Sequence, residues 1–169
     1  STAVLTNSLI RDNRVITMFG STVSHGHGGG VALLTGSVQV VDCVIDGNWM
    51  RTAQRAWGAG LYARQGTHQI RHTLITRNNS LSSGGLASYV RGDALSVDAA
   101  GTVVEMLNCV LAGNKEEAVY TENGSARLIH CTIVGHGVYG LRRNGGTLAA
   151  TNSIIAANSN DVFGVVSLG

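Results

Sequence analysis

A nine-residue phrase recurs six times along this chain, and it constrains the fold more than any other feature. The copies are LTNSLIRDN (5–13), VVDCVIDGN (40–48), IRHTLITRN (70–78), MLNCVLAGN (106–114), LIHCTIVGH (128–136) and ATNSIIAAN (150–158). Their central small residues, at spacings of 35, 30, 36, 22 and 22 residues, are Ser8, Cys43, Thr73, Cys109, Cys131 and Ser153. Self-similarity of this length indicates stacked structural repeats. The basic repeat is therefore 22 residues, and the longer spacings contain insertions of 13, 8 and 14 residues.

A second landmark lies 13 residues before each centre from the second copy onward. It is a small residue followed by an apolar one, at Gly30-Val31, Gly60-Leu61, Ser96-Val97, Ala118-Val119 and Gly140-Leu141. Each repeat thus contains three short β segments between turns, and no window has the 3.6-residue apolar period of a helix. The pattern predicts an all-β fold. It is a right-handed parallel β-helix (solenoid) of about six rungs, a rung being one turn of the coil.

Individual positions of the phrase have distinct structural roles. Two positions are always apolar and are expected to stack inside the coil. They are Leu5, Val40, Ile70, Met106, Leu128 and Ala150, and Ile10, Ile45, Ile75, Leu111, Ile133 and Ile155. The residue before each centre is Asn, Asp or His, which suits a turn with left-handed backbone. The last residue is Asn in five copies, which predicts a hydrogen-bonded asparagine ladder, with His136 as a substitute in the remaining copy.

Length and charge limit the classes of protein to which this chain can belong. The 169 residues fit one domain, 1–169, and the net charge of +2 comes without a run of either sign. That distribution argues against a nucleic-acid binder, and no apolar stretch approaches the roughly 18 residues of a membrane span. The chain opens inside one rung and stops inside another. We therefore expect a processed part of a longer chain or assembly, whose open solenoid ends contact other protein chains.

The phrases GGGVALL, GAGLYAR and N-[SC]-x-[IL]-x-x-N resemble the right-handed parallel β-helix proteins of the pectin-lyase-like superfamily. Within it, the whole chain is similar to repeat regions of large bacterial secreted or surface proteins. The resemblance implies an extracellular or cell-surface location. It also implies a cleft along the outer face of the first strand of each rung, walled by the loops before it. Because this scaffold hosts enzymes and binding proteins alike, the function depends on the site.

The three insertions, 14–29, 49–59 and 79–95, are expected to be those loops. Aromatic rings interleaved with arginines, there and on the neighbouring strands, predict a saccharide-binding surface. Its candidate residues are Trp49, Arg51, Trp57, Tyr62, Arg64, Tyr89, Arg91, Tyr120 and Arg142. The alternative is that the loops only pack their own aromatic rings over one flank of the coil.

The sequence assigns no catalytic residue, no metal site and no cofactor. Carboxylates do not pair at a spacing that suits glycoside hydrolysis. His25 and His27 make an incomplete metal site on their own, and the Gly-His-Gly at 26–28 lacks the clustered aspartates of polygalacturonases. Cys43, Cys109 and Cys131 are expected to be buried free thiols that interchange with Ser and Thr.

The residue after each centre should face outward, because side chains alternate along a strand. This predicts an apolar outer stripe of Leu9, Val44, Leu74, Val110 and Ile154, with Thr132 among them. The stripe is either an interface with another protein chain or is shielded by the insertions and arginine stems.

Taken together, the sequence favours a non-catalytic extracellular structural or binding module of a bacterial surface or assembly component. It would contact saccharide or protein through the inserted loops. The alternative is a polysaccharide lyase or glycoside hydrolase of the pectin-lyase-like superfamily.

Overall fold

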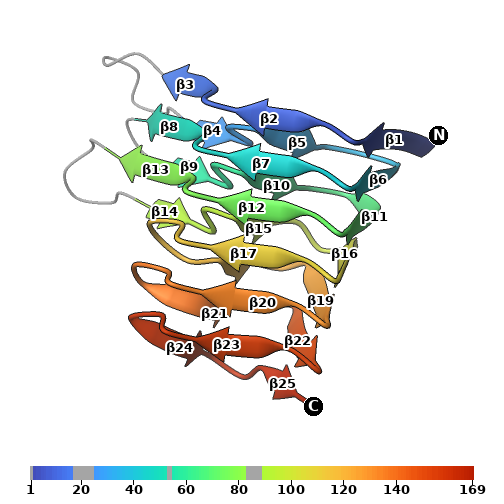
Figure 1. The fold of residues 1–169 in the computed structure, drawn as a ribbon, viewed down its shortest axis with the longest axis vertical. Helices are drawn as coiled ribbons and strands as arrows, with labels where there is room; N and C mark the ends of the chain where they lie inside the picture. Colours follow the sequence, from blue (N-terminus) through green and yellow to red (C-terminus); the bar gives the residue numbers. More distant parts are fainter. Residues whose placement is uncertain (1, 17–24, 53–54, 83–88) are drawn as a thin grey trace.

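The computed structural model describes residues 2–16, 25–52, 55–82 and 89–169, except for the side chain of Tyr89. These residues form strands that stack rung upon rung, and every strand pairing is parallel (Figure 1). The N-terminus lies at one end of the stack and the C-terminus at the other. The predicted parallel β-helix is confirmed.

Three long sheets run along the stack, and each complete rung gives one strand to each sheet. The first sheet contains β5 (Val31–Leu33), β10 (Leu61–Ala63), β15 (Leu95–Val97), β18 (Val119–Thr121), β21 (Tyr139–Arg143) and β24 (Asn160–Phe163). The second contains β1 (Thr2–Thr6), β6 (Ser37–Val41), β11 (Gly66–Arg71), β16 (Thr102–Leu107), β19 (Ser125–Ile129), β22 (Thr147–Thr151) and β25 (Ser167–Leu168). The third contains β2 (Leu9–Arg11), β7 (Val44–Asp46), β12 (Leu74–Thr76), β17 (Val110–Ala112), β20 (Thr132–Val134) and β23 (Ile154–Ala156).

The core is a set of side-chain columns, one or more from each sheet. Fully buried members include Leu61, Leu95, Val119 and Leu141 from the first sheet, Val40, Ile70, Met106 and Leu128 from the second, and Ile45, Ile75, Leu111 and Ile133 from the third. Each member packs above and below on the equivalent residue of the next rung, because the strands pair in register. Burial of such a side chain stabilises the fold by about 1.5–3 kcal/mol.

The corner between the second and third sheets uses a left-handed residue in every rung. The φ angles are +47° to +54° at Asn7, Asp42, His72, Asn108, His130 and Asn152. The next residue is the small centre of the phrase, and its hydroxyl or thiol donates a hydrogen bond to the carbonyl oxygen two residues earlier. This shared bond explains why Ser, Thr and Cys interchange there. Cys43, Cys109 and Cys131 are buried free thiols, as predicted.

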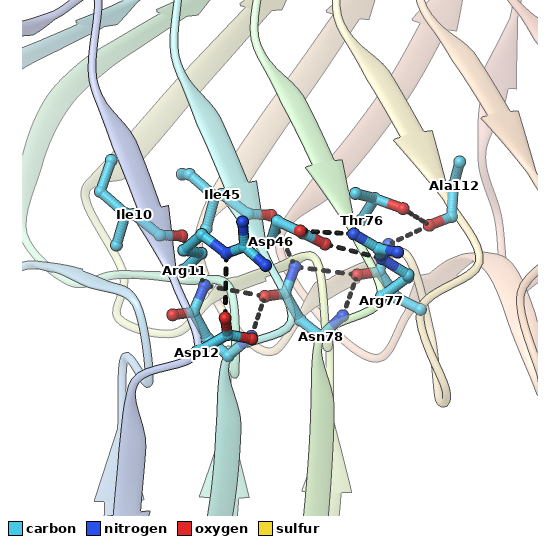
Figure 2. A network of polar contacts seen from close by, with 11 residues as sticks. Ile10, Arg11, Asp12, Ile45, Asp46, Thr76, Arg77, Asn78 and Ala112 are labelled. Carbon is cyan, nitrogen blue, oxygen red and sulfur yellow. Dashed lines mark hydrogen bonds and ion pairs between the residues drawn. The ribbon is translucent and has the colours of Figure 1, made fainter.

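The corner at the other end of the third sheet contains the asparagine ladder. Asn48 donates from Nδ2 to Asn78 Oδ1 at 3.0 Å, and Asn78 donates in the same way to Asn114. The ladder amides after Asn13 also donate to a backbone carbonyl of the preceding rung, as Asn78 does to Ile45 (Figure 2). His136 keeps that second bond, with Nε2 3.1 Å from the Leu111 oxygen. It is therefore the predicted ladder substitute.

The expectation that the insertions are loops is wrong for their described residues. They form two short parallel sheets beside the upper rungs in Figure 1, and we call this pair the extension. One sheet contains β3 (Arg14–Ile16), β8 (Trp49–Thr52) and β13 (Asn79–Ser82), and the other, the return sheet, contains β4 (His25–His27), β9 (Arg55–Trp57) and β14 (Tyr89–Arg91). All three insertions leave the coil at the same corner of consecutive rungs. Their backbones therefore stack at strand spacing and pair.

The extension has a small core of its own. Met50 and Ala56, one from each sheet, are fully buried. A Cβ on Gly26 would lie 2.6 Å from Thr52 Cγ2 and 2.7 Å from the Met50 sulfur, so any larger residue would force these two side chains to move. Packing thus explains this glycine of the Gly-His-Gly tripeptide.

One rung differs from the predicted alignment. The small-apolar landmark of the fourth rung is Ala94-Leu95, because Leu95 and not Val97 pairs with Leu61. The turn between β15 and β16, residues 98–101, is two residues longer than the turn at 64–65 between β10 and β11. Two extra residues in the turn shift the count while leaving the inward face unchanged.

Candidate functional site

A cleft of about 420 Å³ lies between the return sheet of the extension and the outer face of the first sheet. Its lining residues are Arg55, Trp57, Arg91, Tyr120, Glu122, Arg142 and Asn144. The first three come from β9 and β14, and the others from β18, β21 and the residues that follow them. The extension stops at the third rung. The cleft therefore lies where the extension ends: β9 and β14 form one wall, and the rungs below, which have no extension strands over them, form the other.

Two aromatic rings form the apolar part of the cleft. The Trp57 and Tyr120 ring centroids are 6.3 Å apart, a distance at which aromatic rings attract each other. Trp57 is 7% exposed, and its indole Nε1 is buried without a hydrogen-bond partner among the described residues. An unpaired buried donor costs about 1–3 kcal/mol. Trp57 thus carries an unsatisfied buried donor within the wall of the cleft.

Arg142 is held within a cage of aromatic rings. Its guanidinium carbon lies 5.8 Å from the Tyr120 ring centroid, 5.5 Å from that of Tyr139 and 5.2 Å from that of Phe163. Tyr120, Arg142 and Phe163 are register neighbours on the outer face of the first sheet. Cation–π contacts of this kind contribute about 0.5–2 kcal/mol each and fix the orientation of the guanidinium plane.

A buried carboxylate lies behind the two inner arginines. Glu117, fully buried, accepts a hydrogen bond from Arg142 Nη1 at 2.8 Å and one from the Gly92 backbone N–H at 3.0 Å. Arg91 Nη1 lies 3.9 Å from the same carboxylate. Burial lowers the pKa of Arg91, and the negative charge of Glu117 opposes that shift. Paired charges of this kind offset the cost of burying either one alone.

The floor of the cleft has two further polar side chains, Glu122 and Asn144. The Tyr120 hydroxyl donates a short hydrogen bond to Glu122, and Asn144 Nδ2 donates to the same carboxylate at 3.1 Å. Both Glu122 and Asn144 follow strands of the first sheet. The cleft therefore presents three guanidinium groups, two rings, one amide and one carboxylate.

The comparison with protein families identifies this architecture. The family model described as a right-handed β-helix region matches residues 6–162. The chain belongs to the right-handed β-helix family. No curated protein and no solved structure matches it significantly. The family model thus agrees with the predicted hand of the coil, and it assigns no ligand to the cleft.

The structure of this β-helix brings together four of the nine predicted site residues: Trp57, Arg91, Tyr120 and Arg142 line the cleft. Trp49 and Arg51 lie on β8, in the other sheet of the extension, where the guanidinium of Arg14 lies 4.8 Å from the Trp49 ring centroid. Tyr89 begins β14, and its side chain lies outside the described residues.

Tyr62 and Arg64 lie two rungs above Tyr120, on the same outer face. Tyr62 is 1% exposed, because His27 of the extension stacks on it at a centroid distance of 4.5 Å. Its hydroxyl donates to Asp98 at 2.6 Å, and Arg64 Nε lies 4.0 Å from that carboxylate. Burial and this hydrogen bond raise the pKa of Tyr62. Tyr62 therefore holds the extension onto the coil.

Sequence reasoning missed Arg55, Asn144 and Glu117. Arg55 belongs to the second insertion, two residues before Trp57, and alternation along a strand would have placed both on one face. Glu122 could be recognised as outward-facing from its rung position, but its partner Asn144 follows a strand end. Glu117 lies in a turn, and no periodic pattern reports which way a turn residue points.

The residues that the structure describes include no group of three or more His, Cys, Asp or Glu side chains placed to hold a metal ion. His25 and His27 are 6.2 Å apart between ring centroids, with rings nearly perpendicular. No helix in the described ranges is long and apolar enough to span a membrane.

The apolar outer stripe lies on the third sheet. Leu9, Val44, Leu74, Val110, Thr132 and Ile154 form one register column. Leu9 is 59% exposed, Val110 40% and Ile154 61%. Val44 and Leu74 are half-buried. The stripe is thus most open near the two ends of the column.

Proposed function

We propose that this right-handed β-helix is a non-catalytic saccharide-binding module of an extracellular bacterial surface or assembly component. The observation that carries the proposal is the cleft in which Trp57 and Tyr120 lie beside three arginines. The apolar C–H face of a sugar ring packs on aromatic rings, while its substituents need directed polar groups. The extension supplies one wall and the rigid coil supplies the other.

The charges of the cleft favour an acidic saccharide. Three guanidinium groups and one carboxylate, Glu122, line it. Guanidinium groups recognise carboxylate and sulfate groups with paired hydrogen bonds. The exposed position of Arg55 suits capture of the charge, and the caged Arg142 suits its orientation.

The test is calorimetric titration with acidic oligosaccharides and with neutral ones of equal length. We expect binding of the acidic series only, weakening as salt increases. Arg142→Ala should lower that affinity about 10- to 100-fold, the usual worth of a hydrogen bond to a charged group. The matched control is Arg127→Ala, which removes an exposed arginine from the outer face of β19 without touching the cleft. Equal loss in both variants would contradict the proposal.

The alternative, a polysaccharide lyase or hydrolase, makes a different prediction for the same samples. A hydrolase needs two carboxyl groups flanking the scissile bond, and among the described residues that line the cleft only Glu122 carries one. A lyase would leave an unsaturated sugar that absorbs ultraviolet light. Turnover of an acidic polysaccharide that Arg64→Ala or Arg142→Ala abolishes would replace the binding proposal with the enzymatic one.

We also propose that the apolar stripe contacts another protein chain of the assembly. Its support is the exposure of Leu9, Val110 and Ile154 in one column. The double variant Leu9→Asp, Ile154→Asp should remain folded and lose any self-association or partner binding that sedimentation detects. If the wild type sediments as a complex and the double variant sediments in the same way, the stripe is not the interface.

A further inference from the structure

Glu117 lies outside the lining of the cleft, yet it contacts both sides of it. The return segment of the extension provides Gly92 and Arg91, and β21 provides Arg142. Glu117 itself precedes β18 in the rung between them. One carboxylate, 1% exposed, thus links three successive rungs at the point where the extension ends.

The surroundings of Arg142 leave few directions open to its guanidinium. Nη1 is fixed by Glu117, and three aromatic rings lie near the group: Tyr139 of the same strand, and Tyr120 and Phe163 of the two neighbouring rungs. Its Nε is buried and has no hydrogen-bond partner among the described residues. Without the carboxylate, the side chain would lose its one strong directional contact and regain rotamer freedom.

We propose that Glu117 is a positioning residue: its buried carboxylate orients Arg142, and holds Arg91 close, for an anionic ligand in the cleft. The inference rests on the proposed function. It states that geometry, and not the number of positive charges, sets the affinity. The Glu117 carboxylate neutralises one of the two adjacent positive charges. The Arg142 guanidinium that it orients then serves as a preorganised hydrogen-bond donor.

For Glu117→Gln, a model based on net charge and a model based on positioning predict opposite changes in the affinity for an anionic ligand. Glu117→Gln makes the protein more positive by one charge, which alone would tighten binding of an anion. Gln offers a single acceptor oxygen for Arg142 and Gly92 together, so positioning is lost. We expect the affinity for an acidic oligosaccharide to fall about tenfold or more, which corresponds to a charged hydrogen bond of about 1.5 kcal/mol. Glu117→Asp, which keeps the charge and shortens the reach, should also weaken binding.

A double-mutant cycle separates positioning from general damage to the fold. In an Arg142→Ala background, Glu117→Gln should change affinity less than twofold, because the residue that it orients is gone. Glu105→Gln is the charge-matched control, since Glu105 lies on β16 of the second sheet. It should bind like wild type.

A readout without ligand completes the test. The Arg142 Nε–H resonance should be sharp in nuclear magnetic resonance spectra of the wild type and broadened in Glu117→Gln. Unchanged or tighter binding by Glu117→Gln, or a full effect in the Arg142→Ala background, would overturn the positioning role while leaving the proposed function intact. Failure of the wild type to bind any acidic saccharide would overturn both.

Discussion

Single residues explain how so polar a repeat turns its corners. The corner before each small centre could be predicted, because Asn, Asp and His are types that tolerate left-handed backbone. The left-handed backbone at the corner before the ladder could not be predicted. Arg77 and Ala157 adopt positive φ there, at 54° and 55°, although neither residue type favours it. An L-residue in this region costs about 1–2 kcal/mol. Arg77 bonds both oxygens of Asp46, at 2.8 and 2.5 Å, which holds its side chain in place over the corner (Figure 2). These bonds lower the pKa of Asp46.

A second carboxyl, Asp93, makes stability depend on pH. Burial raises its pKa from 3.8 to about 8, so the folded state keeps a proton that the unfolded state releases. Stability contributed by this group is therefore present below pH 4 and is lost as pH rises from about 4 to about 8. Asp93→Asn retains an acceptor for the Glu116 N–H, which is 2.9 Å from Oδ2 in the wild type. It should remove that slope.

The measurement is urea unfolding of both proteins at several pH values between 4 and 9. The stability difference between Asp93→Asn and wild type should grow as pH rises. His27, His68 and His136 have a pKa lowered mainly by burial, so they destabilise the fold as pH falls below 6.5 in both proteins alike. A difference that stays constant with pH would contradict the assignment of the slope to Asp93.

At the scale of elements, the asparagine ladder fastens each rung to the next. Asn78 is fully buried, and its side chain makes four hydrogen bonds: two that it accepts from Asn48 and two that it donates, to Ile45 and Asn114. The ladder was predictable because identical side chains recur at one repeat position. Its depth was not, because burial depends on stacking: ladder residues with a rung on each side, such as Asn78 and Asn114, are buried, whereas Asn13 in the first rung is exposed.

Asn78→Ala should therefore destabilise the protein by about 3 kcal/mol or more, because it leaves several buried groups of Asn48 and Asn114 without partners. Asn13→Ala is the control. Asn13 is exposed and donates one side-chain bond, to Asn48 Oδ1 at 2.8 Å, so we expect a loss below about 1 kcal/mol. Thermal and urea unfolding of the two variants give the comparison. Similar losses in both would show that the ladder is not cooperative along the stack.

The extension marks the limit of prediction at this scale. Its strands lie in insertions of unequal length, which share no repeated phrase. These strands pair because all three insertions leave the coil at the same corner of consecutive rungs. That common corner is apparent only from the stacked structure. The landmark of the fourth rung was placed two residues too late for a different reason: the turn at 98–101 is two residues longer than the turn at 64–65.

At the scale of the whole molecule, the fold follows from the repeat, whereas the cleft follows from where the repeat is interrupted. Periodicity identified the inward columns and the outer faces, including those of Tyr120 and Arg142. The cleft requires in addition that the extension end at the third rung, so that Arg91 of β14 faces uncovered strands below. Such long-range placement is set by tertiary packing and leaves no local signature in the sequence.

The column of small centres has a further consequence. It places one thiol in each of three rungs, at Cys43, Cys109 and Cys131, each at most 2% exposed. Alkylation of each thiol requires local unfolding of its own rung. The three alkylation rates therefore report which rung unfolds first. Rungs couple only to their neighbours, and next to Cys131 lies a rung whose Ser153 and Ile155 are half-buried. In mild urea, mass spectrometry should find Cys131 modified before Cys109, whereas equal rates would mean that the coil opens as one unit.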